Sequence, residues 1–174
     1  MRTWAAVTAA GVAVVVALNG CGDAQGGSSV DARAQLEQRR TYAQARTDNL
    51  ALLAELRTEL SGNVPTLVWL TTEPEVDGES GCGEKEFRDI SDASHATFDS
   101  GGAKGAISDA EWPKAWAAVQ EVAGKKGFND PNIVVDAPGH HVASLYDQDG
   151  AELSINTKVN TAMSIYGACH LKSG

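Results

Sequence analysis

Three histidines and one aspartate are the side chains of this chain whose types and spacing suit metal or acid–base chemistry. His140 and His141 are adjacent, Asp136 precedes them closely, and His170 lies near the C-terminus. If Asp136, His140 and His170 converge, they form a two-histidine, one-carboxylate set of the kind that binds iron. Neighbouring residues of a strand point to opposite faces, so His140 and His141 cannot easily share one metal ion. One hypothesis is therefore a metal-dependent or hydrolytic extracytoplasmic enzyme that uses His140, His141 and His170.

The alternative interpretation of these histidines is that they are loop residues that titrate near neutral pH. The sequence has no HExxH or CxxC spacing, and none of its serines lies in a GxSxG motif. It also has no phosphate-binding or dinucleotide-binding glycine motif. We therefore expect no catalytic residue, metal or cofactor, and we keep His140 and His141 as a candidate surface site.

Cys21 follows an apolar run from Ala5 to Leu18, and Arg2 is the only charged residue before that run. A positive start and a short apolar core are typical of a secretory signal, whereas a membrane-spanning helix needs about 20 apolar residues. The sequence Leu-Asn-Gly-Cys at 18–21 resembles the bacterial lipobox, in which the cysteine is lipidated and becomes the new N-terminus. We predict a signal peptide at 1–20 and lipidation at Cys21; the alternative is a secreted protein with a cysteine near its cleavage site.

Cys82 and Cys169 remain as an even pair if Cys21 is lipidated. Outside the cytoplasm such a pair usually forms a disulfide, and we predict a Cys82–Cys169 bond. The alternative is a metal site, because His170 follows Cys169 directly.

The charge of the chain limits its partners. The formal net charge is −9, and no sustained basic patch is visible. An acidic domain is repelled by DNA and by anionic membrane surfaces, so we expect no nucleic acid as a partner. The expected partners are membrane lipid, through acylated Cys21, and an unknown envelope protein or component. The expected location is the extracytoplasmic face of the cell membrane.

The chain divides into the signal peptide at 1–20, a lipidated cysteine and flexible Gly/Ser-rich tether at 21–30, and a single α+β domain at 31–174. We expect a two-layer fold with an antiparallel sheet of about four strands, packed by a long N-terminal helix and a second helix. Glycine, serine and acidic residues indicate a long irregular loop at about 73–107. The expected helices are 31–60 and 108–126, and the expected strands are 64–72, 132–135, 142–147, 151–156 and 159–169. The strands at 142–147 and 151–156 should form a β-hairpin with its turn at Asp149–Gly150.

Trp112 and Trp116 lie four residues apart on the apolar face of the second helix. At this spacing both rings contact the same neighbouring surface. We interpret them as core residues; the alternative is an exposed aromatic platform for a ligand.

Several segments together resemble the LppA-type lipoproteins of mycobacteria and related actinobacteria. These are the lipobox, the long Ala/Leu/Arg helix, "PTLVWL" before "ESGCG", "EWPKAWAAVQEVAGKKGF", "DQDGAELSI" and the terminal "SIYGACH". The resemblance covers nearly the whole chain after the signal peptide and implies the location and fold of that family. It implies no catalytic residues. The second hypothesis is therefore a membrane-anchored cell-envelope lipoprotein whose non-catalytic domain binds a protein or an envelope component.

Overall fold

The computed structural model describes residues 29–173 of the 174-residue chain. The predicted signal peptide at 1–20 and Cys21 lie outside the described residues, as does the predicted tether except for its last two residues, which begin the first helix. The described helices are α1 (Ser29–Glu37), α2 (Tyr42–Asn63) and α3 (Trp112–Gly124). The described strands are β1 (Val68–Trp69), β2 (Glu75–Gly81), β3 (Ala93–Asp99), β4 (Ala103–Lys104), β5 (Asp130–Ala137), β6 (His140–Tyr146), β7 (Glu152–Thr157), β8 (Asn160–Tyr166) and β9 (His170–Leu171).

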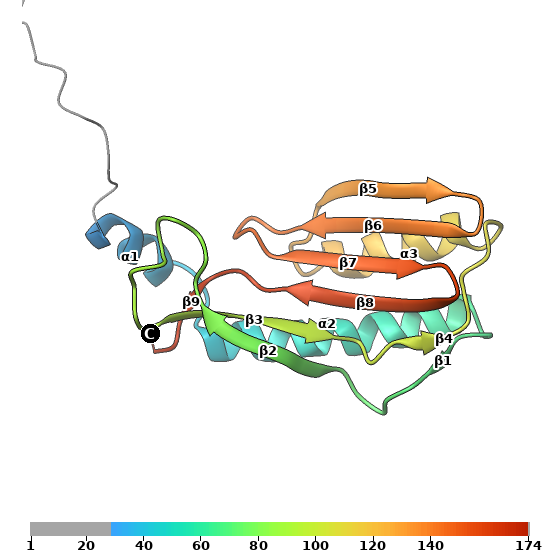
Figure 1. Cartoon of the computed structure of the whole chain (residues 1–174), viewed down its shortest axis with the longest axis horizontal. Coiled ribbons are helices and arrows are strands. Elements are labelled where there is room, and N and C mark those ends of the chain that lie inside the picture. Colours follow the sequence, from blue (N-terminus) through green and yellow to red (C-terminus); the bar gives the residue numbers. More distant parts are fainter. Residues whose placement is uncertain (1–28, 174) are drawn as a thin grey trace, which may run out of the picture.

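All nine strands join one antiparallel sheet. Strands β5, β6, β7 and β8 form a meander in chain order, and β8 then pairs with both β3 and β4. Strand β2 pairs with β3, and β1 pairs with β4. Such a meander is the expected arrangement where consecutive strands are joined by short connections. Figure 1 shows β5 at one edge of the sheet and β2 at the other.

Helices α2 and α3 cover the same face of the sheet, where they lie behind the strands in Figure 1. Leu53 and Leu56 of α2 and Val119 of α3 are buried there against Leu153 and Ile165 of the sheet. We call this hydrophobic cluster the main core. The second helix was predicted at 108–126 and runs from Trp112 to Gly124, and the hairpin formed by β6 and β7 was predicted as well. Both elements position this core.

The predicted sheet of about four strands was wrong. Residues 73–107, expected to form an irregular loop, contain β2, β3 and β4. Most of β2 is exposed, so it has no apolar alternation, and a bulge between Val76 and Gly78 interrupts its register with β3. Pairing with β3, a non-local contact that periodicity cannot detect, makes this segment a strand.

The predicted long N-terminal helix was also wrong, because the chain breaks between α1 and α2. Thr41 is the N-cap of α2, and its side chain accepts the N–H of Gln44, whose side-chain oxygen accepts the N–H of Thr41 in return. This capping box satisfies donors that a new helix would leave unpaired. Residues 38–41 form the α1–α2 linker, which carries Arg39 and Arg40.

A second, smaller hydrophobic cluster lies at the α1 end of the sheet, and we call it the end cluster. It contains Ala32, Leu36, Cys82, Phe87, Ile90, Ala93, Cys169 and Leu171. The predicted disulfide between Cys82 and Cys169 is present, with the Cα atoms 5.8 Å apart. It joins the loop after β2 to the residue before β9, and α1 packs on it.

Candidate functional site

His141 is buried, with 4% of its surface exposed, at the start of β6. Its Nδ1 lies 2.8 Å from a carboxylate oxygen of Asp136, and its Nε2 lies 3.0 Å from one of Asp109. The ring stacks on Trp112 at a centroid distance of 4.8 Å, and Trp112 stacks on Trp116. Trp112 is therefore a core residue, as predicted, whereas Trp116 is only partly buried and packs against the main core. His141 extends the aromatic stack.

Both ring nitrogens of His141 are committed to carboxylates, and an imidazolium can donate to both at once. Neither nitrogen is left to bind a metal. Asp109 also accepts the backbone N–H of Gly139 at 2.7 Å, and this bond, followed by the contact with His141, lowers the pKa of Asp109. The arrangement fastens the β5–β6 turn to the residues just before α3.

The other predicted histidines lie elsewhere. His170 is buried in β9, where its Nδ1 contacts the carbonyl oxygen of Arg40 at 2.9 Å, and burial is the main cause that lowers its pKa. Strand β9 and the start of β6, which carries His140, lie toward opposite ends of the sheet (Figure 1). The structure therefore does not bring Asp136, His140 and His170 together, and the enzyme hypothesis loses the cluster on which it depends.

One group of potential metal ligands is close together within residues 29–173. Cys82, Glu84 and Cys169 place their ligand atoms within 4.8 Å of one another. The disulfide uses both sulfur atoms, so neither is available as a thiolate ligand.

His95 was not singled out by any sequence motif. Its Nε2 lies 2.8 Å from the hydroxyl oxygen of Ser80 and 3.3 Å from that of Tyr166. The Nδ1 atom is buried and has no hydrogen-bond partner in the described part of the chain. A catalytic serine–histidine pair requires a third group that orients the histidine, and this pair lacks one there.

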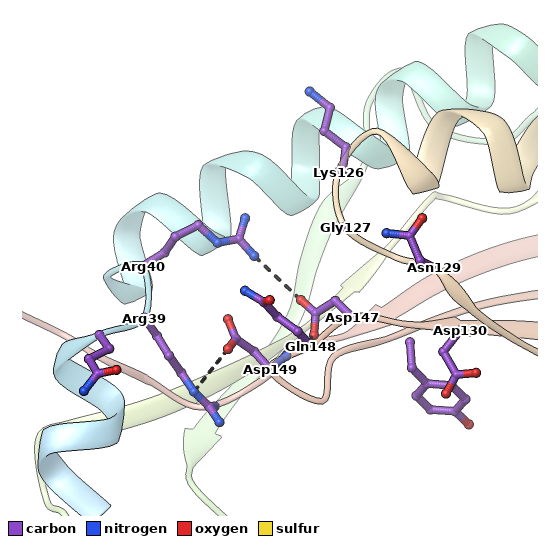
Figure 2. Close-up of a pocket in the computed structure, with 11 residues that line it drawn as sticks. Arg39, Arg40, Lys126, Gly127, Asn129, Asp130, Asp147, Gln148 and Asp149 are labelled. Atoms are coloured by element: carbon purple, nitrogen blue, oxygen red, sulfur yellow. Dashed lines mark hydrogen bonds and ion pairs between the residues drawn. The ribbon is translucent and has the colours of Figure 1, made fainter.

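The largest concavity that we find in the described chain is a cleft of about 800 Å³. It lies between the α1–α2 linker, the α3–β5 connection and the β6–β7 turn (Figure 2). We call it the linker cleft. Its lining residues are Gln38, Arg39, Arg40, Lys126, Gly127, Asn129, Asp130, Tyr146, Asp147, Gln148 and Asp149.

Two ion pairs cross the linker cleft. Arg39 Nε lies 3.4 Å from Asp149 Oδ1, and Arg40 Nη2 lies 3.8 Å from Asp147 Oδ2, as the dashed lines of Figure 2 show. Arg40 also pairs with Asp48 of α2 at 2.8 Å. One wall of the cleft is therefore cationic and the facing wall is anionic.

Backbone contacts hold both walls in place. Asp147 Oδ1 accepts the N–H groups of Asp149 and Ala151, which shapes the turn that leads into β7. Arg39 donates to the carbonyl oxygen of Cys169, and its guanidinium lies 5.0 Å from the centroid of Phe87. The cationic wall is thus fixed to the end cluster.

Sequence reasoning identified none of the cleft residues as a site. The sequence predicted the turn at Asp149, but it also predicted one continuous helix through Arg39 and Arg40. A signal was present in the sequence: Thr41 followed by Gln44 matches the capping-box pattern and marks a new helix start. Two arginines just before such a start belong to a linker.

A family model described as "Lipoprotein confined to pathogenic Mycobacterium", LppA, matches residues 18–173. The chain belongs to the LppA family. The resemblance inferred from the sequence motifs is thereby confirmed, and the match begins at Leu18 and so includes Cys21. LppA membership makes this chain a lipoprotein associated with the envelope.

The fold is similar to that of the crystal structure of the lipoprotein LppA from Mycobacterium tuberculosis, with a TM-score of 0.62. The alignment covers 82% of this chain and 86% of that one at 15% sequence identity, so the likeness concerns the fold. The comparison with curated proteins gave no match. In the part of the chain that the structure describes, no helix combines the length and hydropathy of a membrane-spanning segment.

Proposed function

We propose that this LppA-family chain is anchored by acylated Cys21 to the extracytoplasmic face of the cell membrane. Its domain would be a non-catalytic module that binds a component of the envelope in the linker cleft. The family match that includes residues 18–21 supports the anchor. The disulfide supports an oxidising compartment, because such bonds persist outside the cytoplasm.

The linker cleft carries the binding part of the proposal. A volume of about 800 Å³ lies in the usual range of small-ligand sites, roughly 300–1,000 Å³. Its two arginines pair with two of its aspartates, and no histidine, serine or cysteine is among the described residues that line it. These features favour recognition over catalysis.

The place of the cleft favours an envelope ligand. The α1–α2 linker follows α1 directly, and α1 is the first described element after Cys21. A domain anchored at Cys21 would therefore be attached to the membrane through the end of the sheet that carries this cleft.

The anchor is tested by Cys21→Ala in the full chain. We expect the variant to be unprocessed or released from the membrane fraction, because one thiol carries the lipid. Retention of a fully processed Cys21→Ala chain in membranes would contradict the anchor.

Binding is tested by sedimentation of the mature chain with purified cell-wall fragments. Gln148 is exposed and lines the cleft, so Gln148→Trp should fill it and abolish sedimentation. The matched control is Gln35→Trp, which adds the same ring to an exposed position of α1 outside the cleft. We expect fragments that are chemically unchanged after incubation. Equal sedimentation of both variants, or cleavage of the fragments, would contradict the proposal.

A further inference from the structure

The charges that line the linker cleft balance. The lining has three cationic side chains, Arg39, Arg40 and Lys126, and three carboxylates, Asp130, Asp147 and Asp149. A ligand with only negative or only positive charge would gain no net attraction from such a lining. A ligand with separated charges of both signs gains from each.

Four of these charges already have partners across the cleft, and two do not. Arg39 and Arg40 pair with Asp149 and Asp147. Lys126 and Asp130 are exposed, and neither has an ion-pair partner among residues 29–173. Figure 2 shows Lys126, Asn129 and Asp130 following one another along the α3–β5 connection. This wall therefore offers one free cation and one free carboxylate.

The remaining lining side chains suit peptide groups. Gln38, Asn129 and Gln148 each carry both a hydrogen-bond donor and an acceptor. Tyr146 is the aromatic member of the lining, and no aliphatic side chain contributes to it. An acyl chain would find little apolar surface here, whereas a peptide backbone would find partners for its N–H and C=O groups.

We infer that the linker cleft binds a zwitterionic peptide, with Lys126 contacting its carboxylate and Asp130 contacting its ammonium group. This inference rests on the proposed function and names the ligand class of the same site. The amide side chains would pair with the peptide groups between the two ends.

The test is calorimetric titration of the mature lipidated chain, in detergent micelles, with the peptide Ala-Gln-Asn-Ala in four forms. The forms have both ends free, an acetylated N-terminus, an amidated C-terminus, or both ends blocked. We expect each blocked end to weaken binding by about two- to fivefold, as is usual for the loss of one solvent-exposed ion pair. The doubly blocked peptide should bind most weakly.

Two variants assign each end to its partner. In Lys126→Gln, amidation should no longer weaken binding, and in Asp130→Asn, acetylation should no longer weaken it. The controls are Lys125→Gln, whose ammonium pairs with Glu121, and Asp77→Asn on exposed β2. Both controls lie outside the cleft lining and should behave as the unaltered chain does.

Equal affinity for the free and doubly blocked peptides would overturn the inference. So would the absence of binding by any form, or variants that keep the response to blocking. If Gln148→Trp still abolishes cell-wall sedimentation in that case, the cleft binds something else and the proposed function stands. If the free peptide binds as expected but cell-wall fragments do not sediment, the proposed function fails while the chemistry of the cleft is supported.

Discussion

The main core and the end cluster are held together in different ways. The main core has 24 buried residues from α2, α3, the sheet and the connections between them, whereas the end cluster has eight. Eight residues bury little apolar surface. Because burial stabilises a fold by about 25 cal/mol per Å² of apolar surface, the end cluster gains little stability from packing alone. The end cluster is reinforced by the disulfide, by Arg39 on the ring of Phe87, and by the pair that joins Arg33 of α1 to Asp92.

This difference explains where a binding site can be placed. The linker cleft uses the α1–α2 linker, which depends on the end cluster, and the β6–β7 turn, which depends on the main core. The cleft therefore lies between a region stabilised by packing and a region stabilised by cross-links. Its shape depends on both.

The largest effect is expected in the main core. Phe98 is 2% exposed, and Phe98→Ala should lower the free energy of unfolding by about 3–5 kcal/mol, because it leaves a cavity in close-packed surroundings. Urea denaturation of the mature chain measures the loss. Val159→Ala, at a side chain that is 76% exposed, is the control and should change little. A similar loss in both variants would contradict a packing origin.

The next effect concerns the end cluster. Replacing Cys82 and Cys169 by Ser should lower the free energy of unfolding by about 2–5 kcal/mol. Hydrogen exchange should rise first in α1 and in residues 82–92, because these segments pack on the disulfide. An equal rise in α2 and β7 would show that the two regions unfold as one unit.

A third, smaller effect concerns the histidine that extends the main core. His141→Phe keeps an aromatic ring against Trp112 but removes both contacts with carboxylates. We expect a loss of about 1–3 kcal/mol in the free energy of unfolding, as for hydrogen bonds to charged groups. His140→Phe, at the neighbouring half-exposed position, is the matched control. If His140→Phe lowers the free energy of unfolding as much as His141→Phe does, the contacts of His141 with the two carboxylates contribute no specific stability.

The smallest effect is a pH dependence that comes from His170 of β9, next to the end cluster. Burial lowers the pKa of His170 below its ordinary 6.5, so the unfolded chain binds this proton more readily than the folded chain. Its contribution is therefore complete above about pH 6.5 and declines as the pH falls toward the lowered pKa. In His170→Asn, the midpoint of urea denaturation should therefore depend less steeply on pH between about pH 7.5 and pH 5. An unchanged slope would contradict this origin.

The sequence alone was sufficient for the features that depend on local patterns or on counting. The apolar spacing of α3, the hairpin turn at Asp149–Gly150, and the pairing of Cys82 with Cys169 were predicted and are present. Each depends on residues within one or two turns, or on the pair of cysteines that remains once Cys21 is assigned to lipidation. The family resemblance also followed from motifs in the chain.

Only the tertiary structure decided the number of strands, the break before Thr41 and the site. Strand β2 is exposed and irregular, and its hydrogen bonds come from β3. Arg39 leaves the expected helix to contact Cys169 and Asp149, which are far away in the sequence. Strand pairing and cleft walls are formed by segments that meet only in the folded chain, and local periodicity carries no information about which segments meet.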